Sequence, residues 1–142
     1  MDYQRIMKVA RGELAAELVL KKAKIINVYS GEIEIGDIAI ENGIIVGIGS
    51  YKGQIEHDMD GRYVAPGFID GHVHIESSML TPPGFSRIVV PKGTTTVIAD
   101  PHEIANVCGV KGIQFMLDSS EKIPLNVYMM IPSCVPATKD EN

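Results

Sequence analysis

Two histidines separated by one residue, His72 and His74, are the sharpest chemical feature of the sequence. In an extended strand, residues i and i+2 point to the same face, so both imidazoles can converge on one ion while Val73 packs on the opposite face. Neutral imidazole is a common ligand for zinc, iron and similar divalent metals. Paired histidines in strands also occur without any ligand, but here Asp70 falls on the same face and adds a carboxylate. The spacing therefore predicts a divalent metal site.

A second polar cluster, Asp100-Pro101-His102-Glu103, follows the β-branched segment 94–99. Because active sites assemble at the C-terminal ends of parallel strands, this cluster can lie near the histidine pair. Alternatively, Asp100 caps the next helix and Glu103 completes a capping box. The two roles can coexist, and His102, which has no part in capping, is the clearer functional candidate.

Further polar residues stand close to these clusters. Glu76 follows the histidine pair, where it could orient a histidine, contact substrate or act only as a solvated loop acid. Ser133 and Cys134 follow the segment 126–131. As a nucleophile Cys134 would need a base that the sequence does not place, so we interpret it as pocket wall or core. It lies far from Cys108, and this spacing is typical of two reduced thiols in a cytosolic protein.

Alternating strands and helices are expected to position these residues in the second half of the chain. The segments that end in polar residues are rich in β-branched and apolar types, and helical stretches separate them. Strands are expected at 68–74, 94–99 and 126–131, and helices from Thr81 to about Gly93 and from 104 to 119. Gly109 and Gly112 argue against a continuous second helix. Strand–helix alternation predicts a parallel sheet of the α/β class.

The first half of the chain has a different pattern. A short amphipathic helix is expected over residues 4–16, weakened by Gly12. Short β-rich runs then alternate with turn residues, and the strand candidates are 18–20, 24–29, 33–35, 37–40 and 44–48. Asn42-Gly43 between two such runs is a strong hairpin signal. These features predict a small antiparallel β-structure, part of a sandwich or an open barrel.

Composition excludes several classes of function. With 142 residues and 45% apolar content, the chain has enough apolar residues for one domain-sized core. Its net charge of -5 is scattered and no basic patch is present, so we expect no nucleic-acid partner. No apolar run reaches the roughly 20 residues that span a bilayer, and no signal-peptide pattern opens the sequence. We therefore expect a cytoplasmic protein without a membrane partner.

Four strings of residues resemble a known family. The segment 66–74, PGFIDGHVH, is similar to the first-strand motif of the amidohydrolase superfamily. Three longer strings resemble the adenine deaminase branch of that superfamily: HIESSMLTP at 74–82, GTTTVIADPHEIANV at 93–107 and PSCVPAT at 132–138. The resemblance covers nearly the whole chain and is weakest over its first turns and at 139–142.

The resemblance implies a composite α/β fold. Residues 1–65 would form an N-terminal helix and the leading portion of a β-sandwich. Residues 66–142 would form the start of a (β/α)₈ TIM-like barrel, with its first three strands and two helices. A complete barrel takes roughly 250 residues, so the barrel would be incomplete within these residues.

The resemblance also implies an activity, the hydrolysis of adenine to hypoxanthine and ammonia by metal-activated water in purine salvage, with a carboxylate moving the proton. His72 and His74 would ligate the more buried of two divalent ions, with manganese or iron the usual proposals and zinc a further option. The remaining site candidates are Asp100, His102 and Glu103 for metal or substrate, Glu76 and Glu103 for catalysis, and Ser77, Ser133 and Cys134 for substrate contacts. The expected partners are a purine base and further copies of the chain.

Two other functions stay open on the sequence alone. Another amidohydrolase, such as a cyclic amidase or a deacetylase, would share the histidine pair but lack the strings at 76–78 and 100–103. A non-catalytic, truncated metal-binding or assembly module would use its sheet edge for oligomerisation. Turnover of adenine against dihydropyrimidines would separate the enzymes, and metal titration would identify the module.

We predict that the 142-residue chain alone has no deaminase activity. Three parallel strands cannot close a barrel, and the later metal ligands and proton-shuttling acid of the family lie outside these residues. Unpaired sheet edges should also promote self-association. The measurement is hypoxanthine formation from adenine with added Mn2+ or Fe2+, together with the mass of the chain in solution. Hypoxanthine produced by the purified chain would contradict the prediction.

Overall fold

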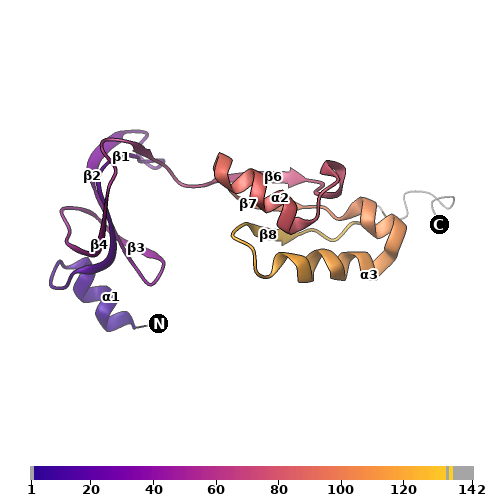
Figure 1. Ribbon diagram of the computed structural model, residues 1–142, viewed down its shortest axis with the longest axis horizontal. Coiled ribbons are helices and arrows are strands. Elements are labelled where there is room, and N and C mark those ends of the chain that lie inside the picture. The colour runs from indigo at the N-terminus through magenta and orange to yellow at the C-terminus, as the bar shows by residue number, and fades with distance from the viewer. Residues whose placement is uncertain (1, 134, 136–142) are drawn as a thin grey trace. The chain divides into compact units, whose positions relative to one another are not determined.

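The computed structural model describes residues 2–133 and residue 135, and the chain divides into two compact units, Met1–Pro66 and Gly67–Asn142 (Figure 1). The first unit joins one helix to a five-stranded sheet, and the second joins a three-stranded sheet to helices. The fold is therefore mixed α/β, as expected. Among the described residues, no helix is both long and apolar enough to cross a membrane.

The first unit is built around one long central strand. Its elements are α1 (Tyr3–Ala10), β1 (Ala16–Ile26), β2 (Ile33–Glu41), β3 (Ile44–Gly49), β4 (Gly53–Asp58) and β5 (Tyr63–Val64). The sheet order is β3-β2-β1-β4, and β5 also pairs with β1. β1, β2 and β3 are antiparallel, but β4 and β5 run parallel to β1. The expectation of an antiparallel structure is confirmed for β1, β2 and β3, and it was wrong for β4 and β5, which the sequence had not indicated as strands.

A β-bulge explains why β1 is longer than the sequence indicated. The register against β2 shifts between Leu20 and Ala23, and Lys22 has a positive φ of 55°. The bulge joins the runs 18–20 and 24–29, which the sequence predicts as separate strands. β1 then ends at Ile26, because the Asn27 side chain accepts hydrogen bonds from the next backbone N–H groups and begins a turn.

Two turns follow the sequence signals directly. Asn42 and Gly43, with φ of 51° and 73°, connect β2 to β3 in the predicted hairpin. Gly12 has φ of 74°, and α1 ends two residues before it at Ala10. The helix is therefore shorter than the 4–16 segment, because its amphipathic pattern runs into a residue that favours a left-handed turn.

Two buried carboxylates tie the first unit together. Glu41 is 3% exposed and accepts from Arg5 Nε at 2.6 Å, so it links α1 to the sheet. Asp37 is 8% exposed and accepts from Lys21 Nζ and from the backbone N–H groups of Lys22 and Tyr51. Burial raises the pKa of Asp37, but these hydrogen bonds outweigh it and lower the pKa below its ordinary value.

The second unit is a parallel α/β layer that confirms the predicted alternation. Its elements are β6 (Phe68–Val73), η1 (Glu76–Ser78), α2 (Pro82–Val89), η2 (Val90–Lys92), β7 (Thr94–Ala99), α3 (His102–Ser120) and β8 (Asn126–Met129), with strand order β6-β7-β8. A core of buried residues joins strand and helix side chains: Ile75, Val97, Ala99, Met116 and Leu125. α3 is kinked at Gly109, where φ is 58° and ψ is -147°, as the glycine indicated.

We predict that Asp37→Asn destabilises the first unit at neutral pH by about 1 to 3 kcal/mol, because the Lys21 ammonium loses its charged partner. The lowered pKa of Asp37 also stabilises the fold above the ordinary value of 3.8, and this contribution is lost as the pH falls through the lowered value. Between about pH 5 and about pH 2, the unfolding temperature should therefore change less with pH in the variant than in the wild type. Circular dichroism during heating measures this temperature.

The matched control for Asp37 is Asp58→Asn. Asp58 pairs with Lys22 in the same chemistry, but both side chains are more than half exposed. Exposed ion pairs contribute little to stability, so this variant should unfold close to the wild type at neutral pH. Equal destabilisation by the two variants would contradict the importance that we assign to the buried carboxylate.

Candidate metal centre

The histidine pair lies at the C-terminal end of β6. His72 is in the strand and His74 follows it directly, and their Nε2 atoms are 3.1 Å apart. Imidazole nitrogens lie about 2.1 Å from a bound ion, so two nitrogens on one ion are about 3.0 to 3.4 Å apart for bond angles of about 90° to 109°. The observed separation fits a single shared ion. The structure therefore brings the two rings together as the strand spacing indicated.

Asp100 adds a carboxylate from the end of the neighbouring strand β7. Its ligand atom and those of His72 and His74 all lie within 4.8 Å of one another. Asp100 is 9% exposed, and its Oδ1 has no hydrogen-bond partner among the described residues. A buried carboxylate oxygen without a partner is costly, and a cation would satisfy it. Two imidazoles and one carboxylate are a donor set that suits zinc, iron and related ions, so these residues fit a divalent metal.

The backbone explains how Asp100 reaches the histidines. Its N–H donates to the carbonyl of Val73 at 2.9 Å, which fastens the end of β7 to the end of β6. Asp70, which shares the predicted face, accepts from the backbone N–H of His72 at 3.1 Å. Among the described residues, the group that could hold an ion contains Asp100 and not Asp70.

The capping interpretation of residues 100–103 does not hold. The N-cap residue of α3 is Pro101, whose own side chain makes no capping hydrogen bond. Asp100 lies one position too early to act as the cap. This geometry leaves its carboxylate free for the cluster of donors beside it.

Glu103 contacts His74 of the cluster but is not one of the three residues grouped as possible metal ligands. Its Oε2 lies 2.9 Å from His74 Nδ1, and its Oε1 accepts from Ser77 Oγ at 2.7 Å. Burial raises the pKa of Glu103, but the hydrogen bonds from Ser77, its own backbone N–H and His74 together lower the pKa below its ordinary value. Glu103 is therefore a hydrogen-bonded carboxylate that supports one of the two imidazoles.

The other candidates lie around this cluster or beyond it. The ring centroid of His102 is 6.2 Å from that of His74, and its Nε2 lies 3.3 Å from the Nδ2 of Asn106. Glu76 Oε1 accepts from the backbone N–H of Ile104 at 3.3 Å, whereas its Oε2 is buried without a partner among the described residues. Ser133 is exposed in a turn after β8, and Cys134 lies outside the described residues.

Sequence reasoning did not single out Asn106. This side chain stands one helical turn after His102, and its Oδ1 is buried without a partner among the described residues. The one available signal was its spacing of four residues from His102, which places the two on the same helix face.

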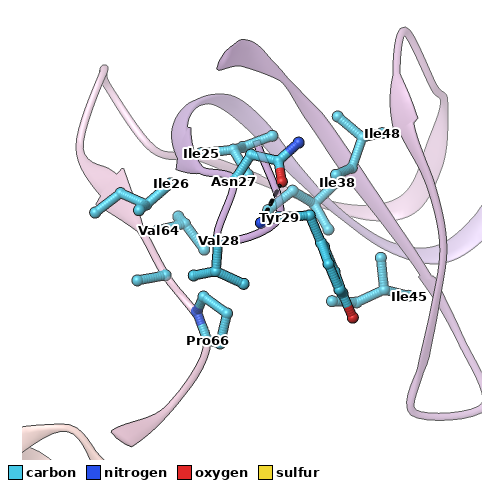
Figure 2. Close-up of a pocket in the computed structure, with 11 residues that line it drawn as sticks. Ile25, Ile26, Asn27, Val28, Tyr29, Ile38, Ile45, Ile48, Val64 and Pro66 are labelled. Atoms are coloured by element: carbon cyan, nitrogen blue, oxygen red, sulfur yellow. Dashed lines mark hydrogen bonds between the residues drawn. The ribbon is translucent and has the colours of Figure 1, made fainter. Parts of the chain in front are cut away.

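A separate apolar pocket of about 300 Å³ lies within the first unit (Figure 2). Aliphatic side chains form most of its wall, among them Ile25, Ile38, Ile45, Ile48, Val64 and Pro66. The polar groups that line it are Asn27 and Tyr29, and the Asn27 side chain accepts from the Tyr29 N–H at 3.0 Å. This lining contains no carboxylate, histidine or cysteine, and its mostly aliphatic wall is suited to apolar packing.

Comparison with known proteins identifies a family and several relatives of this chain. The model of the amidohydrolase family matches residues 63–142. An adenine deaminase from Geobacillus kaustophilus is 61% identical over 93% of this chain and 23% of its own length. An adenine deaminase from Kosmotoga olearia is 56% identical over 100% of this chain and 25% of its own length. The chain thus spans about a quarter of the length of the curated relatives that it matches.

A solved structure shares the fold. An N-acyl-D-glutamate deacylase from Bordetella bronchiseptica, complexed with zinc and a phosphonate inhibitor, aligns with a TM-score of 0.61. The alignment covers 83% of this chain and 30% of the deacylase, at 19% sequence identity. At this identity the likeness concerns the fold alone.

We predict opposite effects of Asp100→Ala on metal binding and on stability. The variant should bind Mn2+ more weakly, because one ligand is lost. Without metal it should unfold at the same temperature as the wild type or a higher one, because a buried oxygen without a partner is removed. Isothermal titration and thermal melts of the metal-free chain measure the two effects, with the exposed Asp118→Ala as control. Unchanged Mn2+ affinity would contradict the role of Asp100.

Proposed function

We propose, from the premise that this chain belongs to the amidohydrolase family, that it supplies the first metal ligands of an adenine deaminase. The observation that carries the proposal is the convergence of two imidazole nitrogens, 3.1 Å apart, beside a buried carboxylate oxygen without a partner. The substrate class rests on the relatives, because adenine deaminases at 51–61% identity match nearly the whole chain. The reaction would convert adenine to hypoxanthine and ammonia.

The proposed ligands of this centre are His72 and His74, through their Nε2 atoms, and the carboxylate of Asp100. When bound, a divalent ion supplies Lewis acidity that activates water for attack on the ring carbon carrying the amino group. Manganese or iron, in a pair of ions, is our expectation for the full centre, with zinc as the alternative. His102 would lie at the edge of this centre, and Ser133 at the mouth of the substrate site.

Proton transfer is better assigned to Glu76 than to Glu103. Both oxygens of Glu103 accept hydrogen bonds, whereas Oε2 of Glu76 is buried and has no partner among the described residues. The other oxygen of Glu76 accepts from the backbone of Ile104, which holds the carboxyl group in place. A carboxyl group that is anchored through one oxygen and keeps the other without a hydrogen bond would accept a proton and return it to a leaving amine.

We also propose a domain assignment for the two units. Residues 1–65 would be the leading portion of a β-sandwich, and further strands would cover the face that carries the apolar pocket. Residues 66–142 would be the first three strands and two helices of a (β/α)₈ barrel. The parallel order β6-β7-β8, with polar donors following β6 and β7, supports this assignment. A cytoplasmic homo-oligomer remains our expectation.

We predict that His72→Ala and His74→Ala abolish both the metal content and the adenine turnover of the full-length protein, because each variant removes one of the converging nitrogens. Metal is measured by elemental analysis, and hypoxanthine by chromatography. His57→Ala is the control, because His57 is exposed on β4 in the first unit and should change neither quantity. A wild-type protein that hydrolyses dihydropyrimidines and leaves adenine unchanged would refute the proposed substrate.

A further inference from the structure

We propose that Ser77 and Glu103 form a positioning relay that fixes the ring orientation and the tautomer of His74. The relay runs from Ser77 Oγ to Glu103 Oε1, at 2.7 Å, and from Glu103 Oε2 to His74 Nδ1, at 2.9 Å. The inference rests on the proposed role of His74 as a metal ligand. It assigns to Ser77 and Glu103 a part that differs from the substrate contact and the metal ligand expected from the sequence.

The donor and acceptor rules determine where the imidazole proton lies. An ionised carboxylate can only accept hydrogen bonds, so the Nδ1 atom of His74 carries the hydrogen that Glu103 receives. In a neutral ring, the lone pair is then on Nε2. That is the atom 3.1 Å from His72 Nε2, where the two rings converge. The opposite tautomer would direct an N–H toward the ion and block coordination.

The chain path explains why these residues meet. Ser77 lies in the short helix η1, three residues after His74, and its backbone N–H donates to the His74 carbonyl at 3.2 Å. Glu103 comes from the first turn of α3, which follows β7. The loop after β6 and the helix after β7 therefore hold the same imidazole. A ligating histidine commonly donates its second N–H to a carboxylate in this way.

Glu103 differs from Asp100 in the hydrogen bonding of its carboxylate oxygens. Both oxygens of Glu103 have partners, whereas Asp100 Oδ1 is buried without one among the described residues. This contrast separates a positioning carboxylate from a ligating one. The Glu103 and His74 side chains are also 42% and 31% exposed, so their contact adds little to folding stability. The main effect of the relay should therefore be on metal affinity.

The first test measures Mn2+ affinity of the full-length protein by titration. Glu103→Ala should weaken binding roughly 10- to 100-fold, as is typical when a carboxylate behind a ligating histidine is removed. Glu103→Gln should bind more tightly than Glu103→Ala, because the amide oxygen can still accept from His74. Ser77→Ala should have a smaller effect of the same sign. Glu121→Gln, at the exposed C-terminal end of α3, is the matched control and should bind as the wild type does.

The second test asks whether Ser77 acts through Glu103. In that case the double variant Ser77→Ala/Glu103→Ala binds Mn2+ no more weakly than Glu103→Ala alone. If the fold-losses of Mn2+ affinity in the two single variants multiply in the double variant, Ser77 contacts the metal or the substrate by itself. That result would overturn the relay. Thermal melts of the metal-free variants, which should match the wild type, exclude a general loss of folding as the cause.

A third measurement reports on the ring directly and needs no metal. Nitrogen NMR of the metal-free protein should show His74 as the Nδ1–H tautomer in the wild type, and a loss of that preference in Glu103→Ala. A wild-type ring with its proton on Nε2 would overturn the relay. If the wild type binds no Mn2+, the proposed metal centre fails, and the tautomer of His74 still decides whether Glu103 positions the ring.

Discussion

The placement of two imidazole nitrogens beside one another is the constraint on which the rest of the second unit depends. Without an ion, the 3.1 Å contact can be a hydrogen bond in which one ring donates its N–H to the other. A cation that replaces this proton can bind both nitrogens and also the carboxylate of Asp100. These three donors are held at one point by the sheet, by the loops that follow its strands and by the start of α3.

Parallel pairing makes this arrangement possible. Because β6 and β7 run in the same direction, their C-terminal ends meet at one edge, and the residues that follow them face a common space. The hydrogen bond from the Asp100 N–H to the Val73 carbonyl extends the pairing past the strands. The core beneath, with Val97, Met116 and Leu125, keeps the helices on the sheet and leaves the polar ends outside it.

Sequence reasoning succeeded where a local rule applies. The period of two in a strand placed His72 and His74 on one face, Asn42-Gly43 specified a hairpin, and the β-branched segment at 94–99 became β7. These signals lie within a few residues of the structure that they produce. Each depends on backbone geometry and not on distant contacts.

Features that depend on tertiary contacts could not be predicted from the sequence. β4 is polar and mostly exposed, so no alternation of apolar residues marked it, and its parallel pairing with β1 depends on the path of the chain between them. Asp100 matched a capping pattern, but Pro101 took the N-cap position and freed its carboxylate. The contact between Ser77 and Glu103 joins residues 26 positions apart and depends on where α3 begins.

The position of β6 in its sheet links metal binding to the order of a strand. Among the described residues β6 pairs with β7 alone, and five of its six residues are exposed. An ion bound to β6 through its imidazoles and to the end of β7 through Asp100 would act as a cross-link between neighbouring strands. By thermodynamic linkage, a chelator would then remove this connection between the two strand ends and lower the stability of the site.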